Sequence, residues 1–430
     1  MKPLDFQLSW PPRKGTPKDA LDATFANLRL LVGGENVTTY VDEDDPRVEG
    51  DHVEQPMLDV AGWIAENWWS LLWEAEKSEE ARASDDYRFR HHLTSAQHGF
   101  ALPNLRFIPT GDAVRLLAQP RQAKYADARF IRKADYLAPR RDVEMSLRAF
   151  MDDVVGTLTQ WGEHPVADAW ALVTSTTPEA AQFCILMGAL GLSPYVEHRR
   201  IEHALEEASD KLSPAELLDL CLTSTGEEFI RSARVATLMH DAMGDADAVD
   251  LRRIEALSPP ADPVDAPAYV RGYDAARKLR AAFGLDETDI DGATKVLEEL
   301  RIDWRAKSTV ELNGFSSPIT GAIRKRRDRG SVAFALDALS SRRFAAARAA
   351  YMFWTDEANE RRFLTNAVTR DQQASRAFAA ELLVPKAYLR SHTRRSRMSW
   401  DQVNAIAERT TVSADVVKNQ AVNMGMTIGH

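Results

Sequence analysis

The chain has 430 residues, of which 44% are hydrophobic and 27% charged, and its net charge is −10. These values are typical of globular domains, exclude a fibrous or wholly disordered chain, and do not favour a globally basic nucleic-acid binder. The length predicts about three domains at roughly 150 residues each. Cys184 and Cys221 are the only cysteines, which excludes a disulfide framework and a cysteine-rich zinc module. With no apolar run long enough for a signal peptide or membrane span, we expect a cytoplasmic protein.

Residues 1–138 are expected to form a strand-rich α/β domain. Apolar and β-branched runs separated by turn residues predict strands at Asp5–Trp10, Thr24–Val32, Val37–Val41, Leu105–Ile108, Ala113–Ala118 and Arg129–Arg132. Apolar residues at helical spacing predict one helix, Val60–Glu74. The polar stretch Ser78–Arg90 is expected to be a loop.

Residues 139–256 show helical periodicity throughout and are expected to form a helical domain. The predicted helices are Val143–Leu158, Thr177–Leu190, Val196–Ser209, Pro214–Cys221 and Gly226–Met243. Ser213 with Pro214 and Glu216 is a typical helix start, because the serine caps the helix and proline suits its first position. Four prolines in Leu257–Pro267 predict a linker at 257–266.

The remaining chain alternates helical and strand-like segments, which completes an α+β, multidomain prediction. Residues 267–397 are expected to form one compact domain, and residues 398–430 a small tail of two short helices. Within the domain we expect a strand-like stretch at Arg301–Asp337 and helices at Ala268–Phe283, Ile290–Leu300, Ser340–Ala358 and Thr369–Leu383. The Ser340–Ala358 helix is expected to pack on a short twisted sheet.

Several segments of residues 267–390 resemble the ImmA/IrrE family of zincin-like metallopeptidases, whose members often act on repressor proteins. The segments that carry the resemblance are Ala268–Leu285, Val296–Ile302, Leu312–Phe315, Ser331–Asp337, Arg343–Ala347 and Asp371–Pro385. The resemblance covers about a third of the chain. It implies a zincin-like fold for the C-terminal domain, with the active-site helix at Ser340–Ala358.

The catalytic motif of that family, HExxH, is absent from this chain. The motif works because residues four apart share one helix face, so two imidazoles bind one zinc while the glutamate takes a proton from zinc-bound water. The resemblance places Arg348, Ala349 and Met352 at these positions and Asp371 at the third ligand. Arginine offers only donors, alanine has no base and methionine is a poor zinc ligand. We therefore expect a pseudoenzyme with no metal or cofactor, and an Arg348–Asp371 ion pair across the lost site.

Four tryptophans fall within eleven residues of the helix predicted at Val60–Glu74. They are Trp63, Trp68, Trp69 and Trp73. One interpretation is an aromatic platform for a ligand or a base. The alternative is a helix packed on its sheet by large apolar rings, in which case Trp68 is buried in the N-terminal domain.

Two basic clusters are candidate phosphate or partner contacts. Arg324, Lys325, Arg326 and Arg327 are expected in a loop between strands, and Arg394 and Arg395 follow the last helix of the domain. Solvated loops are the alternative, given the acidic total charge.

These observations lead to one functional hypothesis and two alternatives. The first is a catalytically inactive, protein-binding regulator, whose partner could be a repressor-type protein in a bacterial stress-response, transcription-control or phage-defence circuit; this follows from the resemblance alone. The second is an active zinc metallopeptidase that cleaves a repressor. The third is a nucleic-acid-associated regulator, with the Arg clusters and the helical tail as its contacts.

Overall fold

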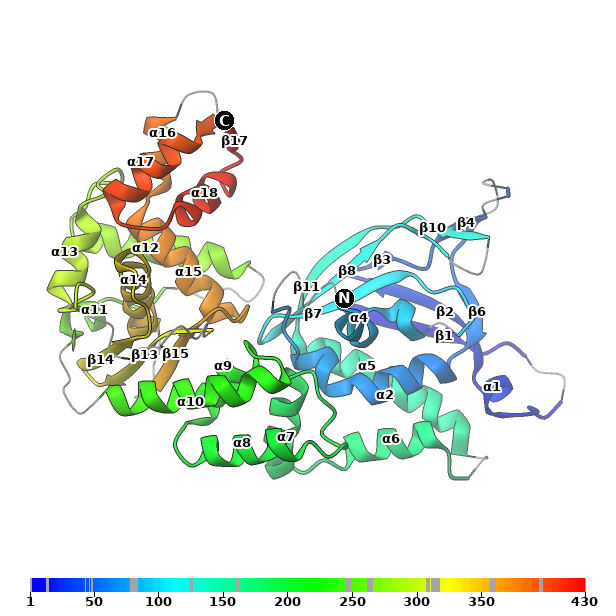
Figure 1. Cartoon of the computed structure of the whole chain (residues 1–430). Helices are drawn as coiled ribbons and strands as arrows, with labels where there is room; N and C mark the ends of the chain where they lie inside the picture. The colour runs from blue at the N-terminus through cyan, green and yellow to red at the C-terminus, as the bar shows by residue number, and fades with distance from the viewer. Residues whose placement is uncertain are drawn as a thin grey trace. The chain divides into compact units, whose positions relative to one another are not determined.

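The computed structural model describes residues 2–12, 15–42, 44–45, 47, 49–77, 84–96, 98–123, 127–159, 162–243, 249–260, 266–306, 310, 318–355, 361–393 and 397–429. The chain divides into two compact units, Met1–Glu197 and His198–His430. Figure 1 colours both units along the sequence.

The first unit is built on three small antiparallel sheets. In the first sheet β2 (Phe25–Val32) pairs with β1 (Leu4–Ser9), β3 (Glu35–Asn36) and β6 (Val53–Pro56). The second has the order β5-β4-β10-β9, made of Glu49–Gly50, Tyr40–Asp42, Ala128–Phe130 and Arg121–Gln122. The third has the order β11-β8-β7, made of Ala134–Pro139, Ala113–Gln119 and Asn104–Pro109. Alternation of apolar and polar residues along β2 and β7 buries one face of each strand.

Two long helices cover these strands, and shorter helices pack behind them. Helix α2 (Leu58–Trp73) contacts β7, and α5 (Arg140–Leu158) contacts β1, β8 and β11. Helices α6 (Pro165–Thr174) and α7 (Pro178–Ala189) pack on α2, on the side away from the strands in Figure 1. The remaining helical segments are α1 (Ala20–Ala23), α4 (Asp85–His91) and the 3₁₀ turn η1 (Leu93–Ala96).

Most predicted elements of this unit are confirmed, with one clear error. The stretch expected as a loop, Ser78–Arg90, contains most of α4, which Ser84 caps through a side-chain bond to the Tyr87 N–H. Two acidic residues in its first turn and basic residues in its last turn suit the helix dipole. Residues 78–83 lie outside the described part. The sequence did not predict strands β3, β5, β6, β9 and β11 or helices α1 and α6.

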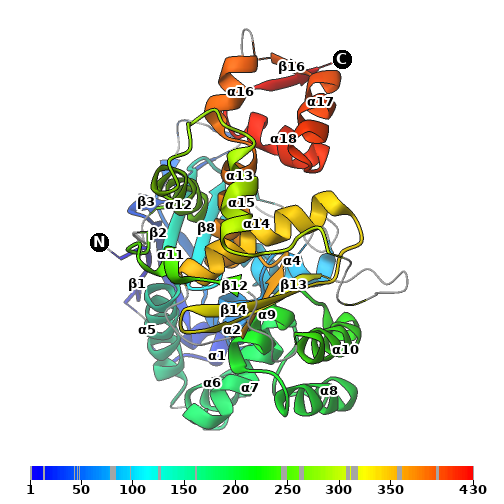
Figure 2. The ribbon, with the colours of Figure 1, turned by 90° about the vertical axis from the view of Figure 1, so that its left-hand side faces the viewer.

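The second unit is organised around one four-stranded antiparallel sheet of order β12-β14-β13-β15. Its strands are Val249–Asp250, Arg329–Phe334, Ile319–Arg326 and Arg361–Thr365. Helix α14 (Leu339–Thr355) packs on β13, β14 and β15. Helices α9 (Pro214–Cys221) and α10 (Gly226–Ala242) contact the same strands, and Figures 1 and 2 place them on the face opposite α14. The sheet is therefore covered on both faces.

Helix α14 also packs against other helices of this unit. Helix α15 (Arg370–Leu383) packs on α14 and on α12 (Ala268–Ala282). At Gly272 of α12 a Cβ atom would lie 2.8 Å from the Ala377 Cβ, so only glycine permits this close approach. Further elements are α8 (Arg199–Ser209), α11 (Arg252–Glu255), α13 (Gly292–Glu299), α16 (Lys386–His392), α17 (Trp400–Thr410), α18 (Ala414–Val422) and the parallel pair β16 (Arg397–Ser399) and β17 (Thr427–Gly429).

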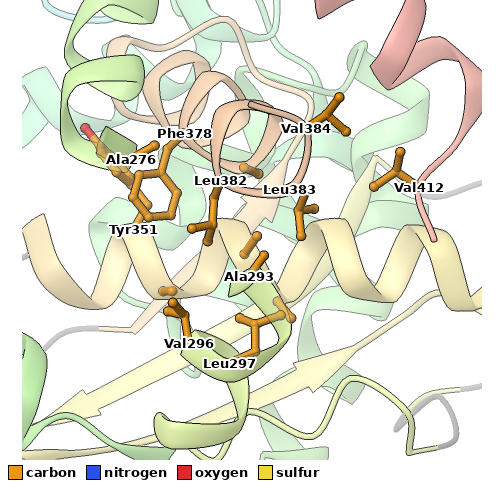
Figure 3. Close-up of a cluster of buried hydrophobic side chains, with 14 of the residues drawn as sticks. Ala276, Ala293, Val296, Leu297, Tyr351, Phe378, Leu382, Leu383, Val384 and Val412 are labelled. Atoms are coloured by element: carbon orange, nitrogen blue, oxygen red, sulfur yellow. The ribbon is translucent and has the colours of Figure 1, made fainter. Parts of the chain in front are cut away.

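The core of the second unit lies between α12, α13, α14 and α15. Figure 3 shows Tyr351 of α14 facing Phe378 and Leu382 of α15, with Val296 and Leu297 of α13 below the helix. All five side chains are buried. The predictions that Ser331–Leu336 is not helical and that Phe344–Trp354 is helical are confirmed.

The architecture is α+β with small antiparallel sheets, but the predicted helical domain at 139–256 is divided between the two units. Helices α5, α6 and α7 belong with the first unit, and α8, α9 and α10 with the second. The physical reason is that α9 and α10 bury their apolar faces on the β13–β15 sheet, whereas α5 buries its own on β1 and β8. The capping box of Ser213 and Glu216 starts α9, as predicted. Of the predicted linker, residues 261–265 lie outside the described part.

Candidate functional site

The three residues that the resemblance aligns with the zinc-binding helix motif, Arg348, Ala349 and Met352, all lie in the second unit. Ala349 and Met352 belong to the apolar core between α14 and its neighbours. Arg348 is only 2% exposed, which makes it one of the largest fully enclosed side chains of the chain. Burial of a guanidinium costs free energy unless its N–H donors are hydrogen-bonded.

The donors of Arg348 reach four neutral acceptors. Its Nε donates to Ser375 Oγ (3.1 Å) and its Nη1 to Thr320 Oγ1 (3.4 Å). Its Nη2 donates to the Thr365 carbonyl (2.8 Å) and to Gln372 Oε1 (2.5 Å). Burial lowers the pKa of Arg348 well below its usual value, and the neighbouring charge of Arg376 lowers it further, although Asp219 opposes both effects. Arginine stays protonated in proteins, so a positive charge lies in this interior.

The predicted ion pair between Arg348 and Asp371 is wrong. Asp371 lies in the first turn of α15 with its side chain 43% exposed, and its Oδ1 accepts a 3.0 Å hydrogen bond from Arg271 of α12. Its other oxygen lies 3.9 Å from Arg362. The next residue along α15, Gln372, is the one that reaches Arg348, because adjacent helical residues point about 100° apart.

Sequence reasoning missed Gln372 and Asp219, which join Arg348 into a polar network. Gln372 Nε2 donates to the Phe363 carbonyl (2.7 Å) and to Asp219 Oδ2 (3.4 Å). Asp219 of α9 is 3% exposed and accepts from Arg362 Nε at 3.0 Å. Burial raises the pKa of Asp219, and the charge of Arg362 opposes that rise. The sequence feature that indicates Asp219 is a single aspartate flanked by leucines in the segment Pro214–Cys221.

These residues do not fit a zinc ion. Zinc needs deprotonated or neutral donors that converge on one point. Here the first position presents a buried cation, the next two present an alanine and a core methionine, and Asp371 is engaged by Arg271. Throughout the described ranges, no three His, Cys, Asp or Glu side chains gather closely enough to hold a metal ion.

Three of the four residues of the first basic cluster lie in a strand, contrary to the prediction of a loop, and only Arg327 lies in the turn between strands. Arg324, Lys325 and Arg326 belong to β13, which runs directly into a hairpin with β14, and Arg327 occupies the turn with φ of 51°. Arg324 and Lys325 are buried, and Lys325 Nζ lies 3.1 Å from Glu255. The strand extends because its backbone pairs on both sides, with β14 and β15. Arg394 and Arg395 lie outside the described residues.

The tryptophan cluster of α2 does not form a shared platform. Trp68 is buried, as predicted, and its ring meets Trp170 edge-on at 5.0 Å. Trp63 donates to the Phe89 carbonyl (2.6 Å), and Trp69 donates to the Tyr195 hydroxyl (2.9 Å). Trp73 lies under the Arg140 guanidinium at 3.4 Å. Each ring therefore packs on a different neighbour of the helix.

The first unit holds a second buried charge cluster, at the C-terminal end of α2. Glu74 is 4% exposed and accepts two hydrogen bonds from Arg90, at 2.6 and 2.7 Å. The His91 Nε2 lies 3.0 Å from the same carboxylate, while its Nδ1 donates to the Phe107 carbonyl. Burial alone would raise the pKa of Glu74, but the bonds and charges of His91 and Arg90 lower it to about 2.

Gly191 closes this cluster. Its φ of 75° is a conformation that glycine adopts freely, and a Cβ atom there would collide with the Glu74 carboxylate. The α2 end, α4 and the turn after α7 therefore enclose a compensated ion group. No sequence signal pointed to it, since Arg90 fell in an expected loop.

Within the described part of the chain, no helix is both long and apolar enough to span a bilayer. Comparison with known proteins adds no relative: no family model, no curated protein and no solved structure matches this chain.

Proposed function

We propose that this chain is a non-catalytic regulator that binds a protein partner, and that its second unit has a zincin-like architecture from which the metal chemistry has been lost. The order of elements from α12 to α15 supports the architecture. Two helices lead into the β13–β14 hairpin, α14 follows, and α15 carries the position of the third ligand. This is the layout that the resemblance to ImmA/IrrE proteins implies.

The buried guanidinium of Arg348 is the observation that carries the loss of catalysis. The resemblance assigns Arg348 to the position of the first zinc ligand, and four acceptors from α15, β13 and β15 fix its side chain. A second guanidinium, Arg376, lies close enough to lower the pKa of Arg348. Two cations here repel a divalent metal ion, so the site disfavours zinc electrostatically as well as by its ligands.

Zinc analysis of the purified full chain tests the catalytic part of the proposal. After incubation with excess zinc and removal of the free metal, we expect far less than one equivalent to remain. Asp371→Asn serves as the control, because it removes the one carboxylate of the former site, and it should leave the zinc content unchanged. One tightly held equivalent that Asp371→Asn abolishes would favour an active metallopeptidase.

The regulatory part rests on the resemblance and needs its own test. The purified chain is mixed with a repressor-type protein encoded by a neighbouring gene, and the mixture is analysed by size-exclusion chromatography and intact mass spectrometry. We expect a complex in which the mass of the partner is unchanged. Cleavage of the partner contradicts the proposal, and so does binding of duplex DNA in place of the protein.

A further inference from the structure

A small cavity in the second unit has the chemistry of an anion site. It measures about 220 Å³ and lies where β13, α14, α15 and α18 meet. Among the described residues that line it, none is acidic, and the polar ones include Arg348, Arg376, Ser340, Ser341, Asn366 and Ser413. The inference from this cavity goes beyond the proposed regulatory role, because it depends on neither the resemblance nor a protein partner.

Both arginines bring positive charge to the cavity, and only Arg348 has a described carboxylate, Asp219, near enough to affect its pKa. Within the described residues, neither Arg348 nor Arg376 forms an ion pair; their hydrogen-bond partners are neutral. Arg376 donates from Nη1 to the Thr365 carbonyl (3.2 Å), and within the described residues its Nε and second Nη make no hydrogen bond. Burial lowers the pKa of Arg376 to about 10, so it is still charged at neutral pH. Two guanidinium groups, one buried and one partly buried, at a cavity whose described lining has no carboxylate favour an anion beside them.

Two helix N-termini add positive potential to the same cavity. Ser340 and Ser341 lie in the first turn of α14, which is 17 residues long. Ser413 is the N-cap of the nine-residue α18, and its hydroxyl accepts from the Val416 N–H. The N-terminus of a helix carries partial positive charge and N–H donors without intrahelical partners, which is why such ends bind phosphate.

The cavity shares part of its lining with a larger groove, which suggests where the rest of the ligand would lie. The groove measures about 540 Å³ and shares Phe344, Arg376 and Val416 with the cavity. Its other lining residues include the aromatic Tyr269 and Tyr273 and the amides Gln373, Asn419 and Asn423. Asp415 is exposed on its wall, so a second anionic group is disfavoured there. A single phosphoryl group attached to an uncharged body suits both spaces.

We propose that the Arg348–Arg376 cavity binds a phosphoryl group, carried by a small phosphate monoester or present as free phosphate. A tetrahedral dianion offers oxygens in several directions, so it can accept from Arg376 and from serine hydroxyls on different sides of the cavity. A carboxylate offers two oxygens in one plane and a single charge, and is the poorer match for two guanidinium groups.

Titration calorimetry on the full chain tests this proposal with four probes: inorganic phosphate, AMP, adenosine and acetate. We expect phosphate and AMP to bind, and adenosine and acetate to bind at least about tenfold more weakly. Tighter binding of AMP than of phosphate identifies an ester as the occupant, and equal affinities identify free phosphate. No binding of either up to about 10 mM, or equal binding of acetate, overturns the proposal.

Three variants connect the binding to this cavity. Arg376→Gln removes a charge, and Asn366→Asp adds a carboxylate at an exposed lining position; each should weaken AMP binding by about tenfold or more. Arg390→Gln is the matched control, since Arg390 is exposed on α16 and does not line the cavity. Because Arg376→Gln relieves an uncompensated charge, its melting temperature without ligand should not fall. Unchanged affinity in both cavity variants overturns the proposal.

Discussion

The two units each bury a charged cluster, but they treat the charge in opposite ways. In the first unit the Glu74 carboxylate is compensated by Arg90 and approached by His91, and the cluster is sealed by Gly191. In the second unit Arg348 is bonded to neutral groups and lies beside another arginine and an open cavity. From this difference we infer two roles for buried charge. A buried charge with an ion-pair partner stabilises the contact between elements, whereas a buried charge without one, beside a cavity, is suited to binding a ligand.

The largest expected effect comes from a substitution in α2. It tests whether the tryptophans of this helix serve packing or ligand binding. Trp68→Ala removes a 2%-exposed indole and should lower the free energy of unfolding by about 3–5 kcal/mol. Hydrogen exchange of peptides from α2 and α6 measures the loss. AMP binding should be unchanged, because the cavity lies in the second unit. An effect under about 1 kcal/mol with lost ligand binding would instead favour an aromatic platform.

Glu74→Gln tests the compensated cluster directly. It removes the charge that balances Arg90 and keeps one oxygen acceptor, so we expect a loss of about 3 kcal/mol, measured by urea unfolding. Asp135→Asn is the control, because Asp135 pairs with Arg115 at an exposed position, and its loss should cost less than about 1 kcal/mol. If the two variants cost the same, the Glu74 cluster does not hold the unit together.

The two clusters contribute to the free energy of unfolding with opposite dependence on pH. The pKa of Glu74 falls from 4.5 to about 2 on folding, so its contribution to stability is complete above about pH 4.5 and disappears as pH falls toward 2. The full contribution is at most about 3 kcal/mol, at 1.36 kcal/mol per pKa unit. The pKa of Asp219 is raised by burial, so its contribution declines as pH rises above the usual 3.8.

Hydrogen exchange followed from pH 5 to pH 3 measures the contribution of Glu74. Peptides of α2 and α4 should lose protection in wild type, and they should lose much less in Glu74→Gln, where the titrating group is absent. Equal acid sensitivity of both proteins would show that Glu74 does not titrate in this range.

The smallest expected effect concerns α9, the helix that carries Asp219 of the Arg348 network. Ser213→Ala removes the N-cap of α9 and should cost about 1 kcal/mol. Because α9 packs on β15, protection should fall in peptides of β15 as well as of α9. Ser399→Ala at the start of α17 is a matched capping-box control, and it should leave β15 unaffected. A loss of protection confined to α9 would show that the stability of this helix is not coupled to that of the sheet.

The sequence by itself determined the local structure of most of the chain. Periodicity and capping located α2, α9 and α14 to within a few residues, because spacing of apolar residues and turn chemistry act over short distances. Residue identity alone also determined that Arg348, Ala349, Met352 and Asp371 are not a zinc-binding set.

Only the tertiary structure decided which side chains meet. Arg348 bonds to Gln372 and not to Asp371, a difference of one residue that the rotation of α15 fixes. Asp219 joins that network from 153 residues away, and Glu74 meets Arg90 across a segment that local pattern predicted as a loop. The same packing placed α9 and α10 on the sheet of the second unit. Such contacts depend on how whole elements bury their apolar faces, which no local pattern in the sequence encodes.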